Sequence, residues 1–251
     1  MSAREPSGRT WGIYPASVFF FAALGVAAVV GFWAKYFSML REAAPFAHAH
    51  GIAMSFWIVL LVIQAYLMRT GRRGLHRQVG QMSYALVPVI VVATALFAHE
   101  GLNRTGLTGP RLLLFYLQAH LLFLFALSWG LAIYNRKTPV VHARFMICTA
   151  LTLIDPIFAR IIGRYIWTPP EPVYVQMITY SMTDLVLVAL IASNWRREWR
   201  LRVYPAMLAA FVPLQPAFSR LADQILLQVS SGRGGMNDRK HSIKVSYESV
   251  R

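Results

Sequence analysis

The chain has a single cysteine, Cys148, and it lies within an uncharged apolar stretch. With no second cysteine, disulfides within the chain and metal sites built from several cysteines are excluded. Acidic residues are scarce as well, with 10 Asp and Glu against 25 Lys and Arg. The sequence also lacks a phosphate-binding glycine loop, a nucleophile elbow and a zinc-protease helix motif, so the common signatures of those enzyme classes are absent.

Charge of either sign is rare. Only 14% of the 251 residues are charged whereas 57% are hydrophobic, and the charges cluster between long uncharged runs. Soluble domains do not have this distribution. A bilayer core is about 30 Å thick and a spanning helix needs roughly 20 apolar residues. We therefore predict an all-α fold, an integral membrane helical bundle of six to seven transmembrane helices.

Seven apolar segments are expected within a single transmembrane domain, residues 13–229, and the first is expected to be a retained helix. Pro45 and Pro139 suit the first turns of two helices, and Pro88 predicts a kink in a third. Three prolines in the last segment leave two alternatives open, a broken helix or one that does not fully cross. The flanking regions are a cytoplasmic N-terminal segment, 1–12, and a polar tail, 230–251, expected to be disordered. The predicted segments are 13–33, 45–68, 76–98, 110–134, 140–162, 173–194 and 203–229.

Basic residues gather in the short turns between segments, above all in 69–77 and 135–139. The net charge of +15 therefore follows from membrane topology, with lipid rather than nucleic acid as the expected partner. The side that holds the N-terminus carries about twice as many turn Lys and Arg as the other side. We expect a multi-pass protein of the bacterial inner (cytoplasmic) membrane with its N-terminus in the cytoplasm.

Four histidines, His50, His76, His120 and His142, each fall in the first part of a different apolar segment, the second to the fifth. Successive segments alternate in direction, so His50 and His120 are expected at the external level, and His76 and His142 at the cytoplasmic level. Paired imidazoles from facing helices are the axial ligands of six-coordinate haem iron. The pattern predicts one or two b-type haems and electron transfer with a redox partner, as in a membrane oxidoreductase component. It does not decide whether the protein is itself an enzyme.

Charged and polar residues near these positions add to the predicted site. Arg160 follows His142 by 18 residues, five helical turns, so it is expected on the same face and could pair with a haem propionate. Arg77 and Arg144 adjoin the cytoplasmic histidines and could serve likewise. Gln64 lies 14 residues after His50 and is expected to point the same way. Two intramembrane carboxylates, Asp155 and Asp184, could pair with Arg160 or Arg164, or form a proton path.

Other interpretations of the same residues stay open. Histidines beside arginines at helix mouths often face lipid headgroups, and the chain could then be a non-enzymatic membrane subunit or assembly factor. A further alternative is an external zinc or copper site, because His48 and His50 begin one segment while His99 and Glu100 end its antiparallel neighbour.

Several of these residues resemble the motifs of known families. The sequence Leu75-His-Arg-x-x-Gly-x-x-x-Tyr84, with Trp57 and Gln64 before it and His142-Ala-Arg-Phe-Met146 after it, resembles a family of bacterial multi-pass membrane proteins known only as a domain of unknown function. That resemblance covers roughly the central 120 residues and implies no activity. The alternation of histidines is also similar to that of the ascorbate-reducible di-haem b-type cytochromes, in which four consecutive helices each give one ligand. In this chain, however, His76 and His142 lie at helix mouths.

Overall fold

The structure, a computed structural model, describes residues 14–105, 109–167, 172–193, 195–196 and 201–212. The predicted segment 1–12, the tail 230–251 and all of the last segment beyond residue 212 lie outside these ranges. The elements are α1 (Tyr14–Phe32), η1 (Phe37–Met39), α2 (Pro45–Arg69), α3 (Arg73–Gly80), α4 (Ser83–Thr105), α5 (Gly109–Tyr134), α6 (Pro139–Leu151), α7 (Ile154–Ile161), η2 (Ile162–Ile166), α8 (Pro172–Ser193) and α10 (Val203–Phe211). Every element in these ranges is helical, so the predicted all-α fold is confirmed.

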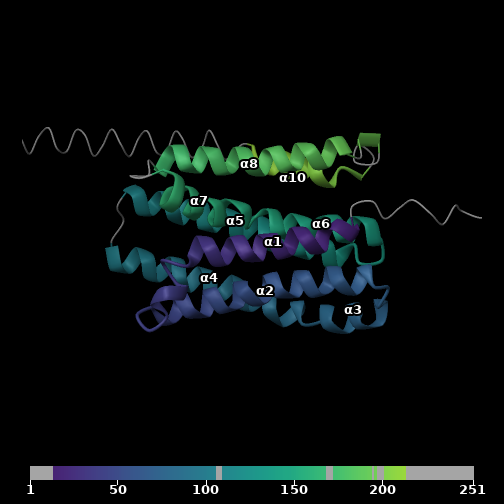
Figure 1. Cartoon of the computed structure of the whole chain (residues 1–251), viewed down its shortest axis with the longest axis horizontal. Coiled ribbons are helices and arrows are strands. Elements are labelled where there is room, and N and C mark those ends of the chain that lie inside the picture. The colour runs from purple at the N-terminus through teal and green to yellow at the C-terminus, as the bar shows by residue number, and fades with distance from the viewer. Residues whose placement is uncertain (1–13, 106–108, 168–171, 194, 197–200, 213–251) are drawn as a thin grey trace, which may run out of the picture.

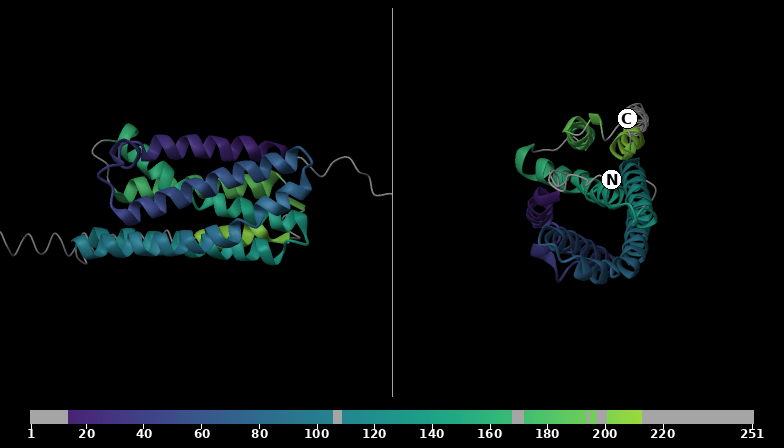
Figure 2. Two further views of the ribbon diagram at one scale, coloured as in Figure 1. Left: turned by 90° about the horizontal axis from the view of Figure 1, so that it is seen from below. Right: turned by 90° about the vertical axis from the view of Figure 1, so that its right-hand side faces the viewer.

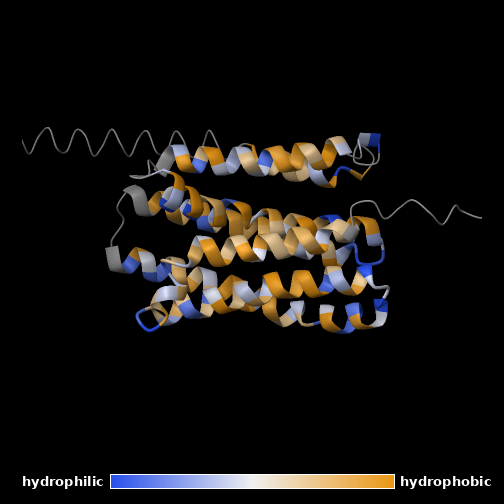
Figure 3. Ribbon diagram, in the orientation of Figure 1, coloured by the Kyte–Doolittle hydropathy of each residue, from blue (hydrophilic) through white to orange (hydrophobic). Residues whose placement is uncertain are grey.

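Five helical stretches are long and apolar enough to cross a membrane: α2, α3 with α4, most of α5, α6 through η2, and most of α8. The shorter apolar stretch Ala16–Phe32 in α1 adds to these five. Hydrophobic residues predominate along the middle of the helices, and hydrophilic residues are most frequent toward the helix ends and turns (Figure 3). Large apolar side chains such as Phe19, Phe123 and Leu185 are more exposed than buried, at 65%, 61% and 70%. A surface of this kind suits lipid rather than water, which identifies a membrane protein.

The helices run along the long axis of the molecule (Figure 1), and their contacts form a closed ring of neighbours. The order around the ring is α1, α2, α4, α5, then the α6–α7 pair, which packs back against α1. The end-on view shows this ring with α8 and α10 outside it, where α8 packs on α7 and α10 packs on α6 and α8 (Figure 2). Trp57 of α2 is fully buried and meets Phe125 of α5 edge-on, with ring centroids 5.1 Å apart. Large side chains thus connect opposite walls of the ring.

Proline places two helix starts as predicted. Pro45 and Pro139 each occupy the first turn of their helix, where a missing N–H leaves no bond unmade. Thr138 is the N-cap of α6, although its side chain makes no capping hydrogen bond. The positions of these prolines in the sequence therefore predicted both helix starts correctly.

Two predicted helices are each divided by a short turn. Residues Gln81 and Met82 separate α3 from α4, and Thr152 and Leu153 separate α6 from α7. The predicted basic turn is correspondingly shorter than expected, because helix resumes at Arg73. Pro88 lies within α4, one turn and a half after the actual interruption. The side chain of Pro88 is exposed, so its ring faces away from the bundle interior.

Candidate functional site

Two of the four predicted histidines meet at one end of the bundle, which we call the basic end because the Arg-rich turns 69–73 and 135–139 lie there. His76 on α3 and His142 on α6 have ring centroids 6.3 Å apart, with ring planes at 89°. Both side chains are half-buried. The helix α5 packs between α4 and α6, so these imidazoles come from spans on either side of a third one. The predicted pairing of His76 with His142 at one level is present in the structure.

The ring of His142 is oriented by the backbone of α5. Its Nδ1 lies 2.8 Å from the carbonyl oxygen of Ala132, which is fully buried. Because a carbonyl only accepts, Nδ1 carries the hydrogen and donates it, and Nε2 keeps its lone pair. This is the arrangement that second-shell carbonyls impose on metal-binding histidines. Sequence reasoning did not find Ala132, since a backbone partner leaves no side-chain signal.

The ring of His76 is held by Gln64 of α2, whose side chain is 8% exposed. With the amide nitrogen of Gln64 facing His76, it donates to Nδ1 and, at 3.1 Å, to the His76 carbonyl oxygen. The amide oxygen then accepts from the Gly80 N–H at 2.9 Å. The sequence singled out Gln64 only as a residue facing the same way as His50. In the structure it instead fastens the short helix α3 to α2.

The arginines near these histidines in the sequence have partners of their own or are exposed. Arg144, two residues after His142, is only 3% exposed, and its guanidinium lies 5.8 Å from the ring centroid of Tyr204. Arg77, next to His76, is exposed. Arg136 donates from Nη1 to the Tyr84 hydroxyl at 3.0 Å, which ties the end of α5 to α4. The role of Arg77 and Arg144 as counter-charges at the site therefore stays a prediction.

The other two predicted histidines have separate partners. His50 stacks on Phe97 with centroids 5.4 Å apart and planes at 8°, and its Nδ1 lies 2.9 Å from Thr94 Oγ1. Since the Thr94 hydroxyl donates to the Ile90 carbonyl at 2.6 Å, it accepts from the Nδ1–H of His50. The ring of His50 is thus fixed on α4, although the prediction placed it opposite His120.

His120 on α5 meets Phe211 of α10 edge-on, with ring centroids 6.4 Å apart. Its Nε2 is buried and has no hydrogen-bond partner among the described residues. A buried nitrogen of this kind is exceptional in folded proteins and marks a position that a ligand can satisfy. The structure therefore brings His76 and His142 together, and it places His120 against α10 rather than beside His50.

Arg160 lies on α7, which a short turn at Thr152 and Leu153 separates from α6 and His142. Arg160 Nη1 donates to the Pro156 carbonyl at 2.6 Å, and the guanidinium lies 4.3 Å from the Phe32 ring centroid. Pairing of Arg160 with a haem propionate stays a prediction.

The alternative external metal site lacks a ligand set in the part of the chain that is described. There, no group of three or more His, Cys, Asp or Glu side chains could hold a metal ion. His48 Nδ1 lies 3.3 Å from the Tyr36 hydroxyl, and Asn103 donates to His99 Nε2 at 2.9 Å. These contacts give His48 and His99 different neighbours, and Glu100 completes no cluster with them.

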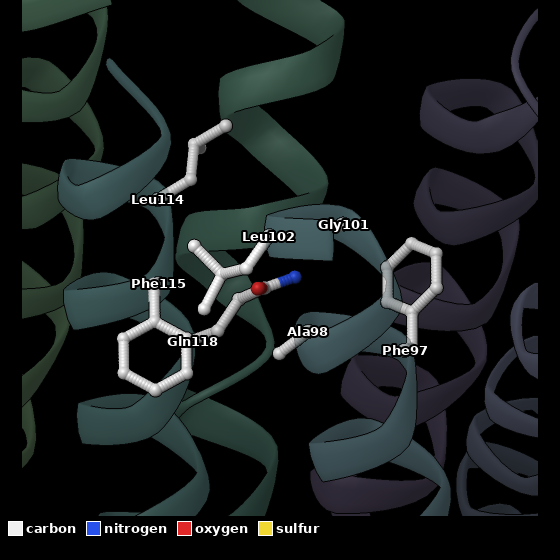
Figure 4. Close-up of a pocket in the computed structure, with 7 residues that line it drawn as sticks. All are labelled: Phe97, Ala98, Gly101, Leu102, Leu114, Phe115 and Gln118. Atoms are coloured by element: carbon white, nitrogen blue, oxygen red, sulfur yellow. The ribbon is translucent and has the colours of Figure 1, made fainter. Parts of the chain in front are cut away.

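A small cavity of about 60 Å³ lies between α4 and α5 near the end opposite the basic end (Figure 4). Phe97 and Phe115 form its aromatic walls, and Gln118 points its amide into it. A cavity that holds benzene measures about 150 Å³, so this one is too small for a ring-sized ligand. The remaining lining residues are Ala98, Gly101, Leu102 and Leu114.

The chemistry available to the chain therefore centres on imidazole nitrogens held by second-shell partners inside a lipid-facing bundle. Comparisons with family models, with curated proteins and with solved structures found no match to this chain.

Proposed function

We propose that this chain is a multi-pass protein of the bacterial inner membrane that binds b-type haem and moves electrons across or within the membrane. The observation that supports it most is the separation of the His76 and His142 rings. An imidazole nitrogen binds a first-row metal at about 2.0–2.1 Å, so two rings that share one metal ion place their centroids roughly 6 Å apart. The observed distance is 6.3 Å.

The partner of His142 fits this role. His142 already has its hydrogen on Nδ1, so Nε2 is ready as a ligand. His76 would need the same tautomer, so ligation through Nε2 would require Gln64 to give up its hydrogen bond to Nδ1 of His76. Haem supplies a reversible one-electron couple, and the chain supplies two neutral donors, a lipid-shielded site and counter-charges for propionates. Arg144 and Arg77 are the candidates for those counter-charges.

The second predicted haem would need His50 and His120 to share one iron, and in the structure the two rings have separate partners on α4 and α10. The bond from His50 to Thr94 leaves Nε2 of His50 free to ligate, and Nε2 of His120 is buried without a partner among the described residues. We expect the basic end to face the cytoplasm, since cytoplasmic turns carry the excess of Lys and Arg. The proposed haem at His76 and His142 would then lie near the cytoplasmic surface.

A visible absorption spectrum tests the proposal. Full-length protein is expressed with added haem precursor and purified in mild detergent, and a Soret band with the narrow α band of bis-imidazole haem is expected. His76→Ala and His142→Ala should each remove the low-spin signature of the cytoplasmic centre, whereas His48→Ala is the matched control and should keep it. Helix content by circular dichroism verifies that each variant is folded. The absence of a Soret band in the parent protein, or an unchanged spectrum in the His76→Ala/His142→Ala double variant, contradicts the proposal.

A second candidate function is that of a non-enzymatic membrane subunit or assembly factor. It is favoured by His50, whose ring is held in place by stacking on Phe97 and by one hydrogen bond to Thr94, without any ligand. Tagged protein would be purified with its native membrane partners, and the four-histidine alanine variant compared with the parent. Equal recovery of the same partners, together with no haem in either sample, supports this function. Loss of the partners together with haem supports electron transfer.

A further inference from the structure

A buried polar cluster lies between α7 and α8, away from the histidine pair. Asp155, at the start of α7, is 0% exposed. Its Oδ1 accepts hydrogen bonds from Nε2 of Gln176 and Oγ1 of Thr179, both on α8. Gln176 is 6% exposed and Thr179 is fully buried. The carboxyl group is therefore enclosed, and one of its two oxygens is fully occupied.

The other oxygen of this carboxyl group has no such partner. Asp155 Oδ2 is buried and makes no hydrogen bond within the described residues. The charged neighbour on α7 is Arg160, yet its guanidinium donates to the Pro156 carbonyl and stacks over Phe32. The titratable neighbour on α8 is the phenol of Tyr180. Asp155 thus has no ion-pair partner in the part of the chain that is described.

An ionised carboxylate in this position would be unfavourable. Removing a carboxylate from water without a paired charge costs several kcal/mol or more, and the group instead becomes neutral by taking up a proton. Protonation on Oδ2 leaves Oδ1 with both of its donors, so the neutral acid keeps every hydrogen bond that the side chain makes. We propose that Asp155 is a proton-binding site within the membrane, with the acid hydrogen on Oδ2.

The backbone beside Asp155 offers an acceptor for that hydrogen. Pro156 has no N–H, so the Thr152 carbonyl lacks the donor that an uninterrupted helix would give it. The chain turns at Thr152 and Leu153 before α7 begins. Broken helices in membrane proteins expose carbonyls at such turns, and there they serve as ion and proton sites. The Thr152 carbonyl is therefore the acceptor that we infer for a hydrogen on Oδ2.

A sodium ion is a poorer occupant of the cluster. Sodium needs several oxygen ligands with free lone pairs, but here the Gln176 amide nitrogen and the Thr179 hydroxyl already donate toward Oδ1. These groups present hydrogens to the carboxyl, not oxygens to a cation. The inferred site goes beyond haem binding and does not depend on it, because no histidine makes a hydrogen bond to the cluster in the described chain.

Infrared spectroscopy of the full-length protein in lipid bilayers tests the site directly. A carboxylic C=O stretching band should persist at neutral pH, should shift in D2O, and should disappear in Asp155→Asn. Asp184→Asn, at the other membrane aspartate of the same bundle, is the matched control and should retain the band. Thr179→Val removes one donor to Oδ1 at almost constant volume, so the band should move to higher frequency without being lost.

Three results would overturn the proposal. One is a neutral-pH spectrum of Asp155→Asn that still contains the band. Another is a band in the parent that appears only at acidic pH, together with the exposed carboxyl groups. The third is loss of the band when sodium replaces potassium at constant pH, which would assign the cluster to a metal cation. Because Thr179→Val preserves the carboxyl group, an unshifted band in that variant also counts against the proposal if Asp155→Asn fails to fold.

Discussion

Replacing Gly31 by alanine tests the close packing of α1 against α7, which forms one wall of the ring. A Cβ at Gly31 would lie 2.9 Å from the carbonyl oxygen of Ile157 and 3.3 Å from Cγ1 of Ile161. The carbonyl belongs to the helical backbone and cannot rotate away, so the two helices must separate. Overpacking of this kind destabilises a protein by about 1–3 kcal/mol.

Two other helical glycines provide matched controls for Gly31→Ala. A Cβ at Gly25 would meet only the end of the Ile58 side chain, at 3.2 Å, and one at Gly130 would meet nothing within 4 Å. Each replacement also stabilises its helix by a similar amount, roughly 0.5–1 kcal/mol, because alanine loses less backbone entropy on folding than glycine does. The difference between variants therefore isolates the contact itself.

The assay is reversible unfolding in mixed micelles, followed by tryptophan fluorescence. Gly31→Ala should have a free energy of unfolding about 1–3 kcal/mol below that of Gly130→Ala, with Gly25→Ala between them. If Gly31→Ala is as stable as Gly130→Ala, the reasoning that places a backbone contact at this point of the α1–α7 interface is refuted.

Two more predictions concern the interior of the ring. Trp57→Ala should lower the free energy of unfolding by about 3–5 kcal/mol, since the fully buried ring and its contact with Phe125 are lost. Phe56→Ala, at a neighbour that is 60% exposed, is the control and should change stability far less; equal losses in the two variants would contradict the assigned burial. Cys148 is 0% exposed and should resist maleimide in the native bundle but react once the protein is unfolded in dodecyl sulfate. Mass spectrometry would detect the adduct, and rapid labelling of native protein would be the contrary result.

The helical fold and several helix starts could be predicted because short stretches of sequence determine them. Long uncharged runs predict spanning helices, and Pro45 and Pro139 mark helix starts through their missing N–H groups. The pairing of His76 with His142 also followed from simple counting, because both residues lie close to a turn on the same side. Distances along short stretches of helix accumulate little error.

The interruptions in two helices and the partners across helices could not be predicted in the same way. Gln81 and Met82 are not helix breakers, so nothing in composition separates α3 from α4. The turn at Thr152 and Leu153 likewise follows no helix-breaking residue, and the face expected for Arg160 stays a prediction. Which faces meet across the bundle depends on packing that one sequence does not specify.

One signal for the partners of Asp155 was nevertheless present. Gln176, Thr179 and Thr183 are polar residues three and four apart in an otherwise apolar segment, so they share one helix face. All three are buried in the structure. A polar stripe in a membrane helix calls for a polar partner, and the carboxyl group of Asp155 is that partner here.

Because of the turn at Gln81 and Met82, the two imidazoles of the basic end are held in place in different ways. His142 is part of a long span and its ring donates to a backbone carbonyl of α5, while His76 is on an eight-residue helix that the Gln64 side chain joins to α2. The orientation of one imidazole is therefore set by main chain, and that of the other by a single amide side chain.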